Sequence, residues 1–263
     1  MINTVSELMD AFHQTKHSLP YVTLKDDGSY AGWVSNFGFK LQGATDAFSL
    51  DLTNESDRFL LYVLAVVWSR SGPWENSAFF VAHLRLRGLD DPKMWLDSDF
   101  VATQRASRAA DAMAVSTAIC NAESRKQIAF RDDIYGSISL LAHNWQGLEK
   151  SLNDCAKQND FMPFAQLLRN IEGLGTNGRK ILIKIPLILR EFRCQGIYPT
   201  IPGHMCCVPD ERVKVAVKAL TDMRMSPAYP ELKNVMRASA QIYDAFGDLY
   251  DLPLFAFNDL QHL

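Results

Sequence analysis

The stretch Leu167–Ile185, LLRNIEGLGTNGRKILIKI, contains two segments of helical periodicity joined by a glycine-rich turn. Gly173 and Gly175 are separated by one residue, and a third glycine and two cations follow at once. Most helix–glycine–helix junctions are plain connections, because glycine readily ends a helix. Glycines also let a partner approach the backbone, and free N–H groups at a helix N-terminus form an anion site. The stretch therefore predicts either a simple turn or a phosphate-binding hairpin.

Cations gather in and after this stretch. Arg179 and Lys180 stand in the first turn of the second helix, where the helix dipole disfavours positive charge unless an external anion faces it. Between Arg169 and Lys218, nine Lys and Arg residues accompany four Asp and Glu residues, in a chain whose net charge is −3. A charge run is usually a solvated face, but its coincidence with a glycine hairpin favours a nucleic-acid phosphate surface. The residues expected to hold DNA phosphates are Gly173, Gly175, Thr176, Gly178, Arg179 and Lys180.

The chain has 263 residues, 48% of them hydrophobic, which suffices for one sizeable core or two modest lobes. Its pattern is helix-compatible almost throughout, and only residues 21–50, with an Asp-Gly turn among β-branched and aromatic residues, predict a small β element. Near the C-terminus, Pro253 is expected to end the last amphipathic helix. We therefore expect a mainly α fold and a single unit of two lobes, residues 1–50 with 221–263 and residues 51–220, with the helix hairpin over 167–192.

Several classes of protein are disfavoured by composition. The longest apolar run, Phe59–Trp68, is about half as long as a membrane span, and no apolar run of signal-peptide length opens the sequence. Five cysteines form neither a disulfide framework nor a CxxC pair, which favours a reducing, cytoplasmic setting. His204 lies close to Cys206 and Cys207 in the loop 194–207, but a zinc site needs three or four ligands, and no second Cys/His cluster follows at suitable spacing. We expect no metal in that loop, no membrane partner and a monomeric protein.

Three segments resemble segments of a known family. The first, Leu167–Lys184, resembles a helix-hairpin-helix motif. Arg58–Arg85, RFLLYVLAVVWSRSGPWENSAFFVAHLR, resembles without gaps a segment of the form "apolar helix, ILSQQTSWKNV, helix", with Trp74 and Asn76 on its W and N. Val208–Leu220, VPDERVKVAVKAL, resembles PVDTHVRRVANRL, with its Asp at position 210. These segments, in this family order, resemble the helix-hairpin-helix DNA glycosylase superfamily.

The resemblance implies a two-lobed helical glycosylase fold and an enzyme that acts on double-stranded DNA. It implies no cofactor, and whether a monovalent cation binds at the hairpin stays open. It implies that Asp210, the acid shared by the catalytic branches, stabilises the positively charged sugar and assists attack by water. Asp210 also fits a plain N-cap, and one residue can serve both purposes. The lyase-competent branches carry a Lys where this chain has Asn177, which implies a monofunctional glycosylase. Lys180 and Lys184 stay open as alternative lyase nucleophiles, and the iron–sulfur cysteines of one branch are absent.

A glycosylase must also hold a base flipped out of the duplex and fill the gap it leaves. The resemblance and the residue types suggest Trp68, Arg70, Trp74 and Asn177 for these roles, with Trp145 as a further aromatic candidate. Arg70 and Asn177 replace commoner family residues, which suggests an unusual substrate such as a deaminated pyrimidine or a hypermodified phage base. The biological role would then be base-excision repair or antiviral defence. Two alternatives stay open: a glycosidase of the same fold acting on free nucleosides or nucleotides, and a non-catalytic helix-hairpin-helix DNA-binding protein.

Overall fold

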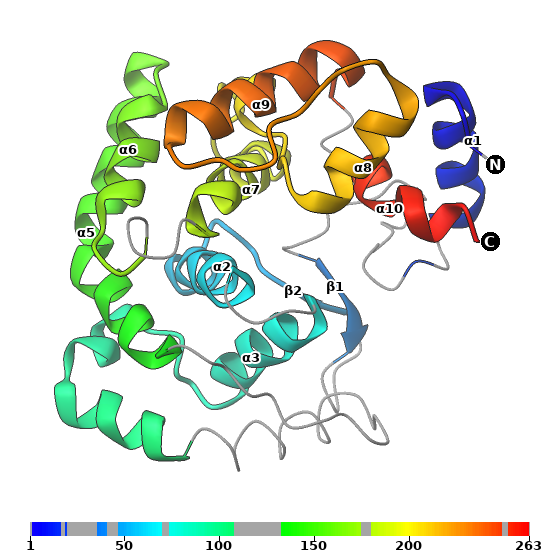
Figure 1. Ribbon diagram of the computed structural model, residues 1–263. Helices are drawn as coiled ribbons and strands as arrows, with labels where there is room; N and C mark the ends of the chain where they lie inside the picture. Colours follow the sequence, from blue (N-terminus) through cyan, green and yellow to red (C-terminus); the bar gives the residue numbers. More distant parts are fainter. Residues whose placement is uncertain are drawn as a thin grey trace. The chain divides into compact units, whose positions relative to one another are not determined.

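The computed structural model describes residues 2–16, 19, 36–40, 47–69, 74–107, 133–174, 180–248 and 252–262. Within these ranges the protein is mainly helical, which confirms the mainly α part of the predicted fold, and the helix-hairpin-helix glycosylase fold stays a prediction (Figure 1). The elements, in chain order, are α1 (Val5–Thr15), β1 (Asn36–Lys40), β2 (Ala47–Ser49), α2 (Glu55–Trp68), α3 (Trp74–Leu86), η2 (Pro92–Leu96), α5 (Ile134–Gln158), α6 (Met162–Asn170), α7 (Lys180–Cys194), η3 (Gly203–Met205), α8 (Glu211–Leu220), α9 (Leu232–Phe246) and α10 (Leu252–Leu260). Residues 98–107 are also helical. No helix in the described ranges combines the length and the apolar composition that crossing a membrane requires.

The chain divides into two compact units. Unit 1 comprises Met1–Trp33 and Leu182–Leu263, and unit 2 comprises Val34–Ile181. The N- and C-terminal segments therefore share a unit, and the divisions fall after residue 33 and inside α7. The lobes expected from sequence, divided after residues 50 and 220, stay a prediction.

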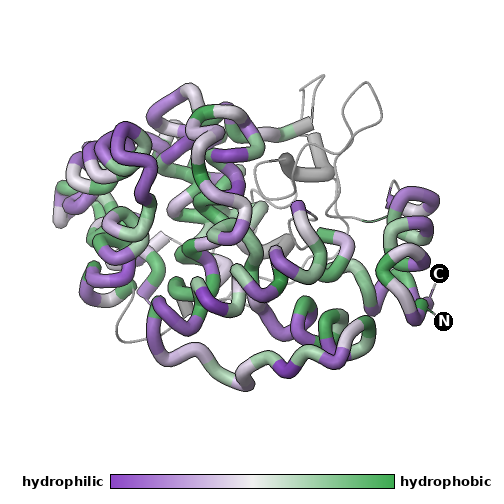
Figure 2. Tube along the Cα trace, turned by 90° about the horizontal axis from the view of Figure 1, so that it is seen from above, coloured by the Kyte–Doolittle hydropathy of each residue, from purple (hydrophilic) through white to green (hydrophobic). Residues whose placement is uncertain are grey.

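Unit 1 brings the two ends of the chain together. α10 packs against both α8 and α1. The backbone N–H of Ile2 donates to Oε1 of Gln261 at 3.1 Å, and Nε2 of Gln261 donates back to the Ile2 carbonyl at 3.1 Å. Both views accordingly show the termini side by side (Figures 1 and 2). Reciprocal bonds between Thr4 and Glu7 form a capping box that begins α1.

Pro253 begins a helix, and the expectation that it ends one is wrong. α9 ends at Phe246, followed by Gly247 at φ +66°, a left-handed value that glycine adopts without steric cost. α10 then begins at Leu252, with Pro253 in its first turn. Proline is tolerated there because the first N–H groups of a helix have no intrahelical acceptor in any case.

The core of unit 2 is built around α2. Every residue from Phe59 to Val67 is buried, as expected of a helix that is apolar around its whole circumference. α3 and α5 pack against it. β1 and β2 form an antiparallel pair with Asn36 opposite Ser49 and Lys40 opposite Ala47, which confirms a small β element within residues 21–50. The Asp-Gly turn on which the prediction is based lies outside the described residues.

Candidate functional site

The predicted hairpin begins with α6 and continues into α7, so two helices flank the glycine-rich turn. The Leu174 N–H donates to the Ile171 carbonyl at 3.1 Å, and Gly173 lies between them at φ +84°. A Cβ atom on Gly173 would lie 2.9 Å from Cδ1 of Leu140. The positive φ is therefore the feature that favours glycine here, whether or not a phosphate binds.

Most of the predicted phosphate contacts lie outside the described residues. These are Gly175, Thr176, Gly178 and Arg179, and the same holds for Asn177 and Arg70. Lys180 is placed as the first residue of α7, but its side chain is not described. The backbone at Gly173 is thus the described part of the predicted phosphate site, and its role in binding DNA stays a prediction.

Part of the local excess of cations among the described residues is paired with carboxylates. Of the seven counted cations whose side chains are described, four pair with carboxylates: Arg190 with Glu191 (3.3 Å), Arg193 with Asp248 (3.0 Å), Arg212 with Asp259 (3.0 Å) and Lys214 with Glu211 (2.7 Å). Two of these carboxylates lie far along the chain, beyond the counted window. Lys184 is 8% exposed, which makes it a poor candidate for a nucleophile that must reach DNA.

Asp210 is the N-cap of α8. Its Oδ1 accepts a hydrogen bond from the Val213 N–H at 3.0 Å, and its backbone is extended, as an N-cap requires. Pro209 before it is buried, whereas Asp210 itself is half-buried. The second carboxylate oxygen, Oδ2, makes no hydrogen bond to the described residues. The capping role is therefore confirmed, and it leaves one oxygen for chemistry.

The loop before Asp210 is packed against α9. The Cys207 N–H donates to the buried Oγ of Ser239 at 2.9 Å, and the His204 ring meets the Tyr243 ring edge-on at 6.4 Å between centroids. Among the described residues, no group of three or more His, Cys, Asp and Glu side chains could hold a metal ion. His204 and the adjacent cysteines thus have structural contacts within unit 1.

Gly203→Ala is expected to destabilise the protein. A Cβ at this position would lie 2.3 Å from Cε2 of Tyr243 and 2.7 Å from Oδ1 of Asp248, which itself pairs with Arg193. Overpacking of this kind costs about 1–3 kcal/mol, measurable from urea unfolding midpoints. Gly147→Ala is the matched control, because the space around Gly147 in α5 is open and alanine stabilises a helix by roughly 0.5–1 kcal/mol relative to glycine. Equal unfolding midpoints for the two variants would contradict the close packing of Gly203 against Tyr243.

The predicted lesion-side segment forms α2 and α3, separated by residues outside the described ranges. Trp68 is half-buried at the end of α2, and Trp74 begins α3 with a side chain that is not described. Trp145 is 3% exposed in α5, and its ring meets Phe59 and Tyr62 edge-on. Trp145 is therefore a core residue of unit 2, and its candidacy for stacking on an extruded base is not supported.

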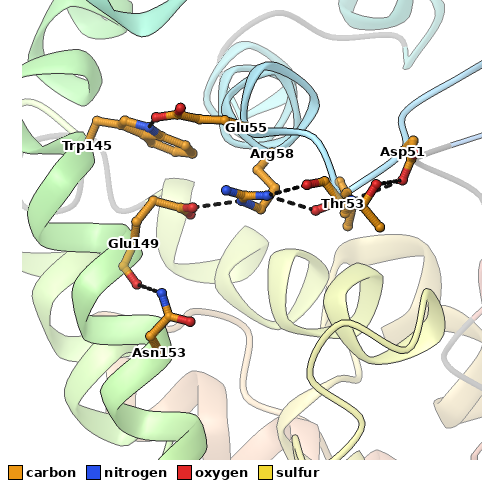
Figure 3. Close-up of polar contacts among 8 residues, drawn as sticks. Asp51, Thr53, Glu55, Arg58, Trp145, Glu149 and Asn153 are labelled. Carbon is orange, nitrogen blue, oxygen red and sulfur yellow. Dashed lines mark hydrogen bonds and ion pairs between the residues drawn. The ribbon is translucent and has the colours of Figure 1, made fainter.

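A polar network that the sequence did not reveal joins α2 to α5 (Figure 3). Nε of Arg58 donates to Oε2 of Glu149 at 2.7 Å, while its Nη1 donates to the carbonyls of Leu52 and Thr53 in the turn before α2. Nε1 of Trp145 donates to Glu55 at 2.8 Å. Ninety-one positions separate Arg58 from Glu149, so no local periodicity could have paired them.

Burial raises the pKa of the Glu149 carboxyl; Arg58 partly offsets this effect, and the nearby Glu55 carboxylate adds to it. Its Oε1 is also buried without a hydrogen-bond partner among the described residues. Because the folded-state pKa is the higher one, Glu149 contributes stability below its unfolded-state pKa, and this contribution is lost as the pH rises through the folded-state pKa.

Glu149→Gln should therefore gain stability relative to the wild type as the pH rises from about 4.3, the usual pKa of glutamate. Denaturant unfolding at a series of pH values measures this difference. Glu172→Gln, at an exposed position beside the hairpin, controls for removal of one carboxylate. If Glu149→Gln instead lost stability relative to the wild type as the pH rises through this range, the direction of the pKa shift would be contradicted.

Comparison with protein-family models, curated proteins and solved structures finds no match. The family resemblance therefore depends on the three segments alone and stays a prediction. The structure adds helices on both sides of the predicted hairpin and an N-cap at Asp210. Asp210 and the hairpin turn belong to different units.

Proposed function

We propose that the protein is a monofunctional DNA glycosylase that hydrolyses the bond between a flipped-out, modified or mismatched base and its sugar. The observation that carries the proposal is Asp210, a half-buried carboxylate whose Oδ1 is fixed by the cap while Oδ2 makes no hydrogen bond to the described residues. The glycine-rich sequence between α6 and α7 supports a DNA partner, because glycines at a helix N-terminus can let backbone N–H groups face a phosphate. The working form would be a monomer on double-stranded DNA.

In this mechanism, positive charge develops on the sugar as the base departs. A carboxylate near C1′ stabilises that charge and takes the proton of the attacking water. Hydrogen bonding of Oδ1 to the α8 backbone holds the group in one orientation, so that little reorganisation accompanies the reaction. Since Asn177 offers no amine, the product would be an abasic site in an unbroken strand.

A glycosidase acting on free nucleosides or nucleotides is the second candidate. The observation in its favour is the pairing of four of the counted cations with carboxylates, which reduces the positive charge available to a DNA backbone. Such an enzyme would need the same carboxylate chemistry but no extended phosphate surface.

The test uses duplexes that each carry one modified or mismatched base, incubated with the protein and then either heated in alkali or kept unheated at neutral pH. If the protein is a glycosylase, strand breaks should appear only after alkali, and Asp210→Asn should form them at least about a hundredfold more slowly. Glu211→Gln, which removes the neighbouring, highly exposed carboxylate, should keep the activity. Binding without breaks would support a non-catalytic DNA-binding protein, hydrolysis of mononucleosides alone would support the second candidate, and breaks without alkali would show lyase activity.

A further inference from the structure

Unit 2 contains a cavity of about 550 Å³ at the first turns of α5. The first half of α5, the helix at 98–107 and Gly173 of the hairpin turn line it. This volume lies within the range of roughly 300–1,000 Å³ that small-molecule sites occupy. Every described lining residue belongs to unit 2, so the cavity does not include Asp210.

An oriented ion pair stands at one end of the cavity. Nε of Arg105 donates to both oxygens of Asp133 at 3.0 and 3.1 Å, and Nη2 donates to Oδ2 at 2.6 Å. Asp133 also caps α5, because its Oδ1 accepts from the Gly136 N–H at 2.9 Å. Nη1 of Arg105 makes no hydrogen bond to the described residues, which leaves a fixed donor edge for a ligand.

Gly136 makes room for this pair. A Cβ there would lie 2.3 Å from Oδ2 of Asp133 and 2.7 Å from Nη2 of Arg105, so a side chain at residue 136 would displace the carboxylate. Leu140, one turn further along α5, adds an apolar wall and is 41% exposed. The cavity thus combines the Arg105–Asp133 ion pair, which lies beside Gly136, with the apolar side chain of Leu140.

His143 supplies an acceptor two turns along the same face of α5, about 10 Å from Gly136 at the helical rise. Its Nδ1 lies 2.8 Å from the Ser139 carbonyl, which can only accept a hydrogen bond, so Nδ1 carries the proton. In the neutral ring, Nε2 is then an acceptor. The hydroxyls of Ser98 and Ser139 add groups that can donate or accept.

The charged residues that line the cavity indicate whether its ligand is an anion or a neutral molecule. Arg105 and Asp133 neutralise each other, and they are the two residues of fixed charge among the described lining. A net-neutral site gives little preference for a free phosphate, whereas donors and acceptors beside an apolar wall suit a neutral heterocycle. We propose that this cavity binds a nucleobase, either as the free base or nucleoside or as a base presented by single-stranded DNA. The proposal goes beyond the glycosylase chemistry and would stand if Asp210 proved non-catalytic.

Isothermal titration calorimetry tests it with a panel of adenine, uracil, adenosine, cytidine, a short single-stranded oligonucleotide and inorganic phosphate. At least one base, nucleoside or oligonucleotide should bind saturably, and inorganic phosphate should not. Arg105→Gln and Leu140→Trp should each weaken this binding about tenfold or more, the first by removing the donor edge and the second by filling the cavity. Lys157→Gln, an exposed change near the far end of α5, should leave binding unchanged.

The same panel distinguishes a free base or nucleoside from a base within a nucleic acid. Binding of the oligonucleotide alone would identify the ligand as a base within single-stranded DNA. Arg105 and Leu140 are both substantially exposed, so folded variants are expected, and thermal melting checks this. The proposal is overturned if no base, nucleoside or oligonucleotide binds at millimolar concentration. It is also overturned if binding persists in both variants, or if inorganic phosphate binds as tightly as the best base.

Discussion

Asp210→Asn is expected to slow base release by about 10²–10³-fold or more while leaving the fold intact, because an amide can cap α8 but cannot carry the negative charge the reaction needs. Asparagine caps a helix about as well as aspartate, so the hydrogen bond to the Val213 N–H should persist. The measurement is the single-turnover rate of base release from a duplex that the wild type processes.

Asp210→Ala separates the two roles of this residue. Loss of the cap should cost about 0.5–2 kcal/mol of stability, and activity should fall as far as it does with asparagine. If asparagine retained the wild-type rate while alanine lost it, the cap alone would explain the effect. Asp210 would then be a structural residue without a catalytic role.

The largest expected effect on stability is that of Trp145→Ala. The indole is buried, meets Phe59 and Tyr62 edge-on at 5.3 and 5.4 Å between centroids, and donates from Nε1 to Glu55 at 2.8 Å. Truncating a buried aromatic to alanine costs about 3–5 kcal/mol, because a cavity remains. Urea unfolding midpoints measure the loss.

Trp145→Phe is the graded control. It retains an aromatic ring among Phe59 and Tyr62 but removes the donor to Glu55, and removing a side-chain donor costs roughly 1–3 kcal/mol. The expected order of stability is wild type, then Trp145→Phe, then Trp145→Ala. A wild-type midpoint for Trp145→Ala would contradict its place in the core of unit 2.

Features that depend on local sequence were predicted well. The apolar pattern of Phe59–Trp68 predicts a buried helix, and α2 is one. Asp210 before an amphipathic segment predicts an N-cap, and the cap is present. Pro253 was misread, because proline can mark the first turn of a new helix as well as the end of a preceding one.

Features that depend on contacts between distant segments were not predicted. Arg58 and Glu149, Arg105 and Asp133, and Arg193 and Asp248 are pairs from separate elements, and neither composition nor periodicity indicates such partners. The pairing of Arg193 with Asp248, for example, neutralises one of the cations counted along the chain. The cavity beside Gly136 was missed for the same reason, since three separate segments line it.

The central claim is that Asp210 and a water molecule release a base from DNA, and mass spectrometry of the free base is its most direct test. Duplexes that each carry one modified or mismatched base are incubated with the wild type and with Asp210→Asn, and the free bases are quantified. We predict that the wild type releases the base from at least one duplex into solution and leaves the strand unbroken, and that Asp210→Asn releases it at least about a hundredfold more slowly. Equal release by both proteins, or no release from any duplex while free nucleosides are hydrolysed, would contradict the claim.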